Sequence, residues 1–170
     1  DLFGGNRRAV EAAQARTGAA VWSLRDAEIL LTAEVARAYL DYRALDRRIA
    51  INDQLQDVRA EALAFHQVRL RHGLTTTLDE RRAERDIAAD AAAHQDLIAQ
   101  RTAQAHALAV LLGRPPLALI TELAAAPPAS EAATADAIPV GLPSDLLRRR
   151  PDVRVAERDL AAATADFGVA

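Results

Sequence analysis

Several residue types are scarce or missing in this 170-residue chain. It has no cysteine, which excludes disulfides, a thiol nucleophile and a cysteine-based zinc site. Only 4% of its residues are aromatic, so little bulk is available to fill a deep globular core. Lysine is also missing, and arginine supplies all 21 basic side chains. No apolar run approaches the roughly 18 residues that a membrane-spanning helix needs.

The signals of catalysis and of nucleic acid binding are missing as well. The net charge of −3 provides no excess of positive charge for nucleic acid. Neither His66 and His72 nor His94 and His106 have the i, i+4 spacing that places two metal ligands on one helix face. No glycine-rich phosphate loop, nucleophile elbow or spaced carboxylate pair occurs. We therefore expect no enzyme activity, no metal and no other cofactor.

What the chain does contain is helix-forming sequence, of which roughly a quarter is alanine. All seven prolines lie at or after Pro115. The proline-free stretch 6–71 predicts one helix, with Asn6 as a candidate N-cap and Gly18 marking a bend or a close approach. At about 1.5 Å per residue this helix is roughly 100 Å long. A compact domain of this size is only about 35–40 Å across, so the chain is predicted to be extended.

A second long helix is predicted to return along the first. Gly73 is typical of the residue that follows a helix, and a tip over 72–77 leads into a helix over 78–112. One of the tip threonines is expected to cap that helix, and Asp79 suits its positive end. Because so short a turn makes the two helices antiparallel, the predicted fold class is all-α, with a long, coiled-coil-like antiparallel hairpin over 1–113.

Two apolar lines follow the first helix at alternating steps of three and four residues. The first line contains Val21, Leu24, Leu31, Val35, Ala38, Tyr42, Leu45 and Ile49. Beyond Ile49 it meets the polar residues Asn52, Gln56 and Arg59. A second line then takes over, formed by Ile51, Leu55, Val58, Ala62 and Phe65. Two lines indicate contacts with two different neighbours, as in a closed ring of helices.

The remaining segments are shorter. An Ala/Pro-rich connector over 114–143 is predicted to be partly irregular. The last segment, 144–170, contains a helix over about 151–165 that opens on a proline. The charged run 80–86 beside the tip has two interpretations that stay open here. It is either a solvated face with ion pairs along one helix or a polar docking surface.

Five stretches of this sequence resemble a known family. They are Asp1–Gly4 with the following Arg-Arg-Ala-Val-Glu-Ala-Ala, then Leu31–Leu40, Arg71–Asp79, Leu111–Pro115 and Gly141–Val153. In this order they resemble the outer-membrane efflux proteins, the TolC-like channels of multidrug pumps. The last stretch is the most specific, and it is close to a signature of the lipoprotein branch. The resemblance covers nearly the whole chain.

The resemblance implies a homotrimeric full-length protein whose hairpins build an α-helical barrel across the periplasm. Such a protein is the passive exit duct of an inner-membrane RND pump, joined to it by a periplasmic adaptor protein. The resemblance places this chain in the periplasmic part of an outer-membrane protein, held in the membrane by segments outside the chain. It makes 114–143 an equatorial connector and 144–170 the start of a second repeat.

The resemblance also assigns the gate and the adaptor contact to the hairpin tip. The residues it points to are Arg71, Gly73, Leu74, Thr75, Thr76, Leu78 and Asp79. We expect Gly73 to matter for backbone geometry and the others for contact.

Some features depart from the family, and two other functions stay open. Gly5 and Asn6 stand where a charged residue is usual. The chain opens without a signal peptide, in the manner of a piece of a longer protein. A periplasmic adaptor also has a long hairpin, but it should carry lipoyl-like β segments on both sides. A stand-alone helical interaction protein would leave 141–153 without an explanation.

Overall fold

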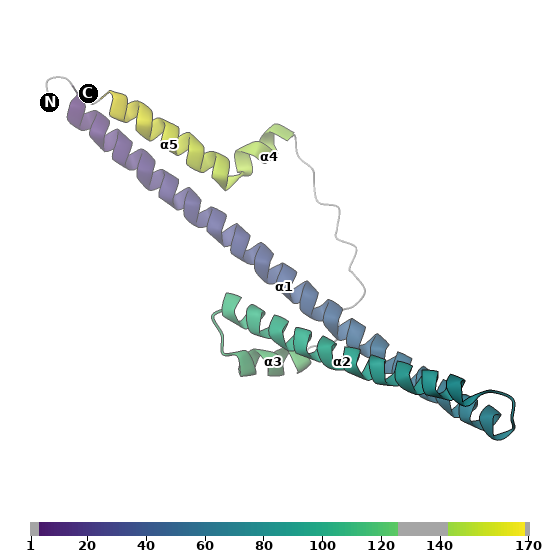
Figure 1. Cartoon of the computed structure of the whole chain (residues 1–170). Coiled ribbons are helices and arrows are strands. Elements are labelled where there is room, and N and C mark those ends of the chain that lie inside the picture. Colours follow the sequence, from purple (N-terminus) through teal and green to yellow (C-terminus); the bar gives the residue numbers. More distant parts are fainter. Residues whose placement is uncertain (1–3, 126–142, 169–170) are drawn as a thin grey trace. The chain divides into compact units, whose positions relative to one another are not determined.

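The computed structural model describes residues 4–125 and 143–168, without the side chains of 143–145, and these residues are almost entirely helical (Figure 1). The helices are α1 (Gly5–Arg71), α2 (Thr77–Leu111), α3 (Pro116–Ala125), α4 (Pro143–Arg149) and α5 (Pro151–Phe167). No strand occurs in the described part of the chain, and the predicted all-α fold class is confirmed.

The start of α1 and the connector differ from what the sequence predicted or lie partly outside the described residues. Asn6 is not the N-cap of α1, because the helix already begins at Gly5, after Gly4 with its positive φ of 78°. The positive φ of Gly4 lets the chain enter the helix at Gly5, before the predicted N-cap. The connector expected over 114–143 lies largely outside the described residues, which stop at 125 and resume at 143. Its described beginning contains α3.

The chain divides into two compact units, one formed by Asp1–Glu34 with Ala132–Ala170 and the other by Val35–Glu131. In the first unit, α5 runs antiparallel to the beginning of α1. Arg16 is ion-paired with Asp166, and the guanidinium of Arg154 lies 5.7 Å from the centroid of the Trp22 ring.

Small residues account for the packing of this first unit. Apart from Pro151, its buried residues among those that the structure describes are all alanine, namely Ala12, Ala15, Ala19, Ala162 and Ala165. Alanine lets two helix backbones approach closely, because it has no bulk beyond Cβ. Gly18 marks a close approach, since a Cβ there would lie 3.3 Å from Cδ of Arg158. The high alanine content is therefore part of how the helices pack.

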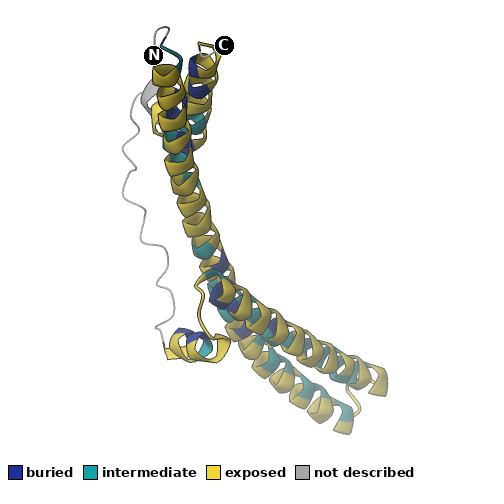
Figure 2. Ribbon diagram, turned by 90° about the vertical axis from the view of Figure 1, so that its left-hand side faces the viewer, coloured by how far each residue is buried: buried dark blue, intermediate teal, exposed yellow. Residues whose placement is uncertain are grey.

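The second unit is the hairpin of α1 and α2, with α3 folded against its open end (Figure 1). Seven buried residues from the three helices form the apolar cluster, Ala38, Tyr42, Ala105, Leu108, Ala109, Leu119 and Leu123. Gln104 adds a hydrogen bond from its Nε2 to the Ala38 carbonyl oxygen at 3.3 Å. Buried residues of the hairpin gather at this end, while the arms toward the loop are intermediate or exposed (Figure 2).

The turn between α2 and α3 explains why α3 folds back. Gly113 has a φ of 62°, and Arg114 N–H donates to the Ala109 carbonyl oxygen at 2.9 Å, as in a Schellman motif. Arg114 also pairs with Glu122 of α3 at 2.7 Å. Among the described residues no single helix is long and apolar enough to cross a membrane, and α2 and α3 meet that requirement only together, bent by 114°.

Candidate functional site

The tip of the hairpin begins with a Schellman motif at the end of α1. Gly73 has a φ of 70°, a backbone conformation that residues with a Cβ rarely adopt. Its N–H donates to the Leu70 carbonyl oxygen at 2.9 Å, and Leu74 N–H donates to the Arg69 carbonyl oxygen at 2.9 Å. The Arg69 side chain also donates to the Leu74 carbonyl oxygen. Gly73 is therefore needed for the backbone path of the tip.

The carboxylate of Asp79 closes the other side of the tip. Thr76 is the N-cap of α2, and its backbone N–H donates to Asp79 Oδ2 at 3.3 Å, the reciprocal contact of a capping box. The hydroxyls of Thr75 and Thr76 donate to the same oxygen at 2.8 Å and 2.9 Å. One carboxylate therefore fixes two of the predicted tip threonines.

These hydrogen bonds set the electrostatics of the tip. The pKa of Asp79 is lowered, first by the Thr75 hydroxyl, then by the hydroxyl and N–H of Thr76 and by nearby Arg82. Each of these donors stabilises the ionised carboxylate. The tip is therefore built around a negative charge at the positive end of the α2 dipole.

The structure brings the predicted tip residues together in one turn, with different roles. Leu74 and Leu78 expose 64% and 55% of their surfaces, so two apolar side chains face solvent where the chain reverses. Arg71, the last residue of α1, is also exposed. Gly73 and Asp79 hold the turn together, as the hydrogen bonds above show. The exposed residues are available for contact, whereas these two act through backbone geometry and capping.

The charged run beside the tip combines two kinds of ion pair. Arg81 pairs with Glu84 at 2.8 Å within α2, as expected for a solvated helical face. Asp86, in contrast, pairs with Arg59 of α1 at 3.5 Å as well as with its neighbour Arg85 at 2.6 Å. The pKa of Asp86 is lowered, first by the hydrogen bond from Arg85. Part of this run therefore holds the two helices together.

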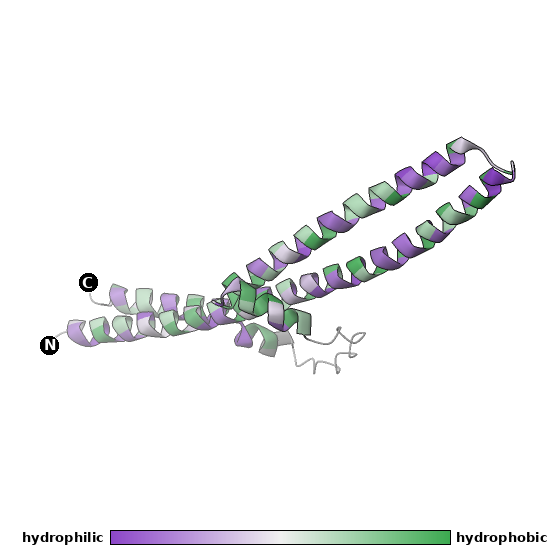
Figure 3. Ribbon diagram, turned by 90° about the horizontal axis from the view of Figure 1, so that it is seen from below, coloured by the Kyte–Doolittle hydropathy of each residue, from purple (hydrophilic) through white to green (hydrophobic). Residues whose placement is uncertain are grey.

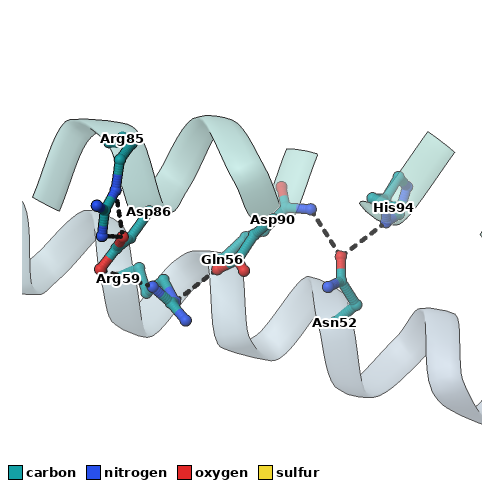
Figure 4. Close-up of polar contacts among 7 residues, drawn as sticks. All are labelled: Asn52, Gln56, Arg59, Arg85, Asp86, Asp90 and His94. Atoms are coloured by element: carbon teal, nitrogen blue, oxygen red, sulfur yellow. Dashed lines mark hydrogen bonds and ion pairs between the residues drawn. The ribbon is translucent and has the colours of Figure 1, made fainter. Parts of the chain in front are cut away.

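Polar side chains join the two helices along most of the hairpin, in what we call the polar ladder. It consists of the contacts Asp46–Arg101, Asn52–His94, Arg59–Asp86 and Arg59–Asp90. The two members of each contact lie at similar numbers of residues from Gly73. This symmetry is that of an antiparallel pair, and it confirms the predicted hairpin. Three of these contacts are drawn in Figure 4.

The Asn52–His94 contact shows how the ladder satisfies its polar groups. His94 Nδ1 lies 3.2 Å from Asn52 Oδ1 and 3.3 Å from Asp53 Oδ1. Asn52 Oδ1 also accepts a hydrogen bond from Gln56 Nε2 at 2.9 Å. Because both oxygens facing the imidazole are acceptors, this geometry requires the hydrogen on Nδ1.

The ladder contains the residues that sequence reasoning missed. Asn52, Gln56 and Arg59 were noted only as the place where the first apolar line stops. In the structure they keep the three- and four-residue spacing of that line. Asn52 and Arg59 continue its contact with α2 through polar groups, and Gln56 supports Asn52. The second line does not take over this contact, and its large members remain exposed on α1. The shared spacing is the sequence signal by which this interface could have been found.

An open pocket lies between the two helices, from the Arg59–Asp86 contact of the ladder toward the tip. It is lined by Arg59, Ala62, His66, Asp79, Arg82, Ala83 and Asp86. Across the described ranges 4–125 and 143–168, no group of His, Asp and Glu side chains is arranged to hold a metal ion.

Sequence comparisons relate this chain to known outer-membrane proteins. The sequence model of the family described as "Outer membrane efflux protein" matches residues 1–114. Nodulation protein T of Rhizobium leguminosarum bv. trifolii is 33% identical over 168 residues, which are 99% of this chain and 36% of that protein. Outer membrane protein OprJ of Pseudomonas aeruginosa is 33% identical over 170 residues, 100% of this chain and 35% of OprJ.

Solved structures give the same result. The outer-membrane channel OprN matches with a TM-score of 0.90 and 38% sequence identity, covering 99% of this chain and 37% of that chain. The outer membrane protein VceC of Vibrio cholerae, at 24% identity and a TM-score of 0.83, shares the fold. This chain spans little more than a third of the length of the relatives it matches. It belongs to the outer membrane efflux protein family, as its tip and its 141–153 stretch indicated.

Proposed function

We propose that this chain is the periplasmic helical segment of an outer-membrane efflux duct. The duct passively conducts drugs or other solutes that a tripartite pump exports. The observation that carries the proposal is the match to the channel OprN over 99% of this chain. The names of other relatives point the same way, among them a solvent efflux pump outer membrane protein and a toluene efflux pump outer membrane protein, both of Pseudomonas putida.

In this proposal the hairpin supplies one wall element of a helical tunnel. The exposed second line on α1, Ile51, Leu55, Val58, Ala62 and Phe65, would then face a neighbouring helix in a homotrimer of the full-length protein. The segment 144–170 would begin a second repeat with another hairpin. The proposed function requires no catalytic residues, because passive conduction involves no covalent step.

The tip would contact the periplasmic adaptor of an RND-type inner-membrane pump and form the gate. Exposed Leu74 and Leu78 offer apolar contacts, and Arg71 offers a charge, at the point where the chain reverses. Thr75, Thr76 and Asp79 would hold the tip in the shape that the adaptor recognises. Gly73 would allow that shape.

The duct is tested by complementation. A strain that lacks the gene should become more susceptible to exported compounds, and the gene should restore resistance. If the wild-type gene fails to restore resistance, the proposal that the protein is an efflux duct is contradicted.

The tip assignment is tested separately, with matched variants. Leu74→Asp and Gly73→Ala should reduce both resistance and cross-linking to the adaptor. The controls are Leu117→Asp, at an exposed leucine of α3, and Gly113→Ala, at the other helix end with a positive φ. Equal behaviour of the tip variants and the wild type would overturn the tip assignment and leave the duct standing.

A further inference from the structure

Fully buried apolar side chains do not occur along the whole length of the hairpin. Ile49 of α1 and Leu97 of α2 are the buried residues nearest the loop. None of residues 50–96, which lie between them in the chain, is buried. We call residues 50–96 the distal arm. Hydrophilic residues recur along both of its helices up to the loop (Figure 3). The pocket near the tip lies within it, where the facing Ala62 and Ala83 are too small to fill the space.

One side chain of α1 is ion-paired with two carboxylates of α2 in this arm. Arg59 Nε lies 2.5 Å from Asp90 Oδ2, and Arg59 Nη1 lies 3.5 Å from Asp86 Oδ2. Asp86 and Asp90 are one helical turn apart on the same face of α2, so a single planar guanidinium reaches both carboxylates (Figure 4).

One carboxylate of this bridge is better shielded from water than that of an ordinary surface ion pair. The Asp90 side chain is only 16% exposed, so water screens its charge poorly. Asp86 is in addition fixed by two hydrogen bonds from Arg85 at 2.6 Å and 3.1 Å. One of the two carboxylates that Arg59 meets is therefore already held in place.

We propose that Arg59 is a latch that keeps the two helices of the distal arm paired. When the latch is released, the helices of the distal arm separate while the apolar cluster at the other end of the hairpin stays packed. The proposal concerns the pairing of α1 with α2 within one chain and does not depend on the proposed function.

Distances between spin labels test the latch directly. The chain has no cysteine, so labels attach within it only where cysteines are introduced. One pair, Ala60→Cys with Ala89→Cys, uses exposed alanines of the distal arm. A second pair, Ala44→Cys with Ala103→Cys, uses exposed alanines beside the apolar cluster. Both pairs are placed in the protein expressed from its complete gene, and labelled protein is diluted with unlabelled protein so that distances within one chain dominate.

The latch predicts a change confined to one pair of labels. Arg59→Leu should lengthen and broaden the distance distribution of the distal pair and increase the separated population about fivefold, while the second pair is unchanged. Asp86→Asn combined with Asp90→Asn should give the same result from the other helix. Arg48→Leu, at an exposed arginine of α1, is the control and should leave both pairs unchanged.

A charge swap separates pairing from a general loss of helix. Arg59→Asp combined with Asp90→Arg should restore the narrow distal distribution, because it rebuilds the pair in the opposite sense. Salt near 1 M, where the screening length is about 3 Å, should broaden the distal pair of the wild type. The proposal is overturned if Arg59→Leu and the double asparagine variant leave the distal pair unchanged. It is also overturned if both label pairs broaden together.

Discussion

The two ends of one hairpin are held together by different chemistry. Next to α3, the buried side chains between α1 and α2 are apolar, and Leu108 and Ala109 are 2% and 0% exposed. In the distal arm the same two helices meet through Asn52, Arg59 and their partners, and no residue there is buried. Ile49 and Leu97 are the buried residues nearest the loop, and the polar ladder begins beside them at Asp46–Arg101, with no break in either helix.

This difference shows how stability and specificity can be divided along a helix pair. Burying a leucine contributes about 1.5–3 kcal/mol and is insensitive to salt. A partly exposed ion pair contributes about 1 kcal/mol or less, but it accepts only one register and one partner type. The apolar cluster therefore stabilises the hairpin, and the polar ladder determines which residues of the distal arm face each other.

The largest expected effect is in the apolar cluster. Leu108→Ala should lower the free energy of unfolding by about 2–5 kcal/mol, because it removes a buried side chain and leaves a cavity. Val110→Ala is the control, since Val110 lies on the same helix and is 77% exposed. Urea denaturation followed by circular dichroism measures both. Equal losses in the two variants would show that the cluster is not a core.

The next effect is at the tip, where no apolar core is available to compensate. Gly73→Ala should destabilise the turn by about 1–2 kcal/mol, because an alanine at a φ of 70° is strained although nothing blocks its Cβ. Amide hydrogen exchange of the tip residues should accelerate, while exchange beside the apolar cluster should not change. Unchanged exchange at the tip would contradict the assigned role of Gly73.

A smaller effect depends on pH. Because the folded pKa of Asp79 lies below the ordinary value of 3.8, its hydrogen bonds stabilise the tip at higher pH. This stabilisation is lost as the pH falls through the folded pKa. Amide exchange of Thr76, corrected for its intrinsic pH dependence, should show tip protection decreasing in acid. Asp79→Asn should remove this dependence, and a dependence that persists in that variant would contradict the assignment.

The smallest effect is expected on the solvated face of α2. Arg81→Ala removes an exposed i, i+3 pair with Glu84 and should change stability by only a few tenths of a kcal/mol. Denaturation in low and high salt measures it. A loss as large as that of Leu108→Ala would mean that the charged run stabilises the hairpin far more than its exposure suggests.

Local signals predicted the tip well. A glycine after a helix, followed by threonines and an aspartate, is the local sequence of a helix end and a helix start, so Gly73 and Asp79 were identified without any knowledge of packing. The antiparallel hairpin followed from the shortness of the turn. The all-α class followed from the absence of proline before Pro115 and from the apolar spacing.

The polar ladder was harder to predict because it depends on register. In the sequence, Asp86 is one member of a charged run. It forms an interhelical contact only because the hairpin places it opposite Arg59. A search for opposite charges at nearly equal numbers of residues from Gly73 would have found Asp46–Arg101. The exposed second line on α1 was predicted to meet a different neighbour, and its role stays a proposal.

The most direct test of the difference between the two ends is residue-resolved hydrogen exchange along α1 and α2 at low and high salt. The account predicts that amides of the distal arm exchange faster than those beside the apolar cluster, and that salt accelerates exchange only in the distal arm. Uniform protection along both helices, or an equal response to salt at the two ends, would contradict it.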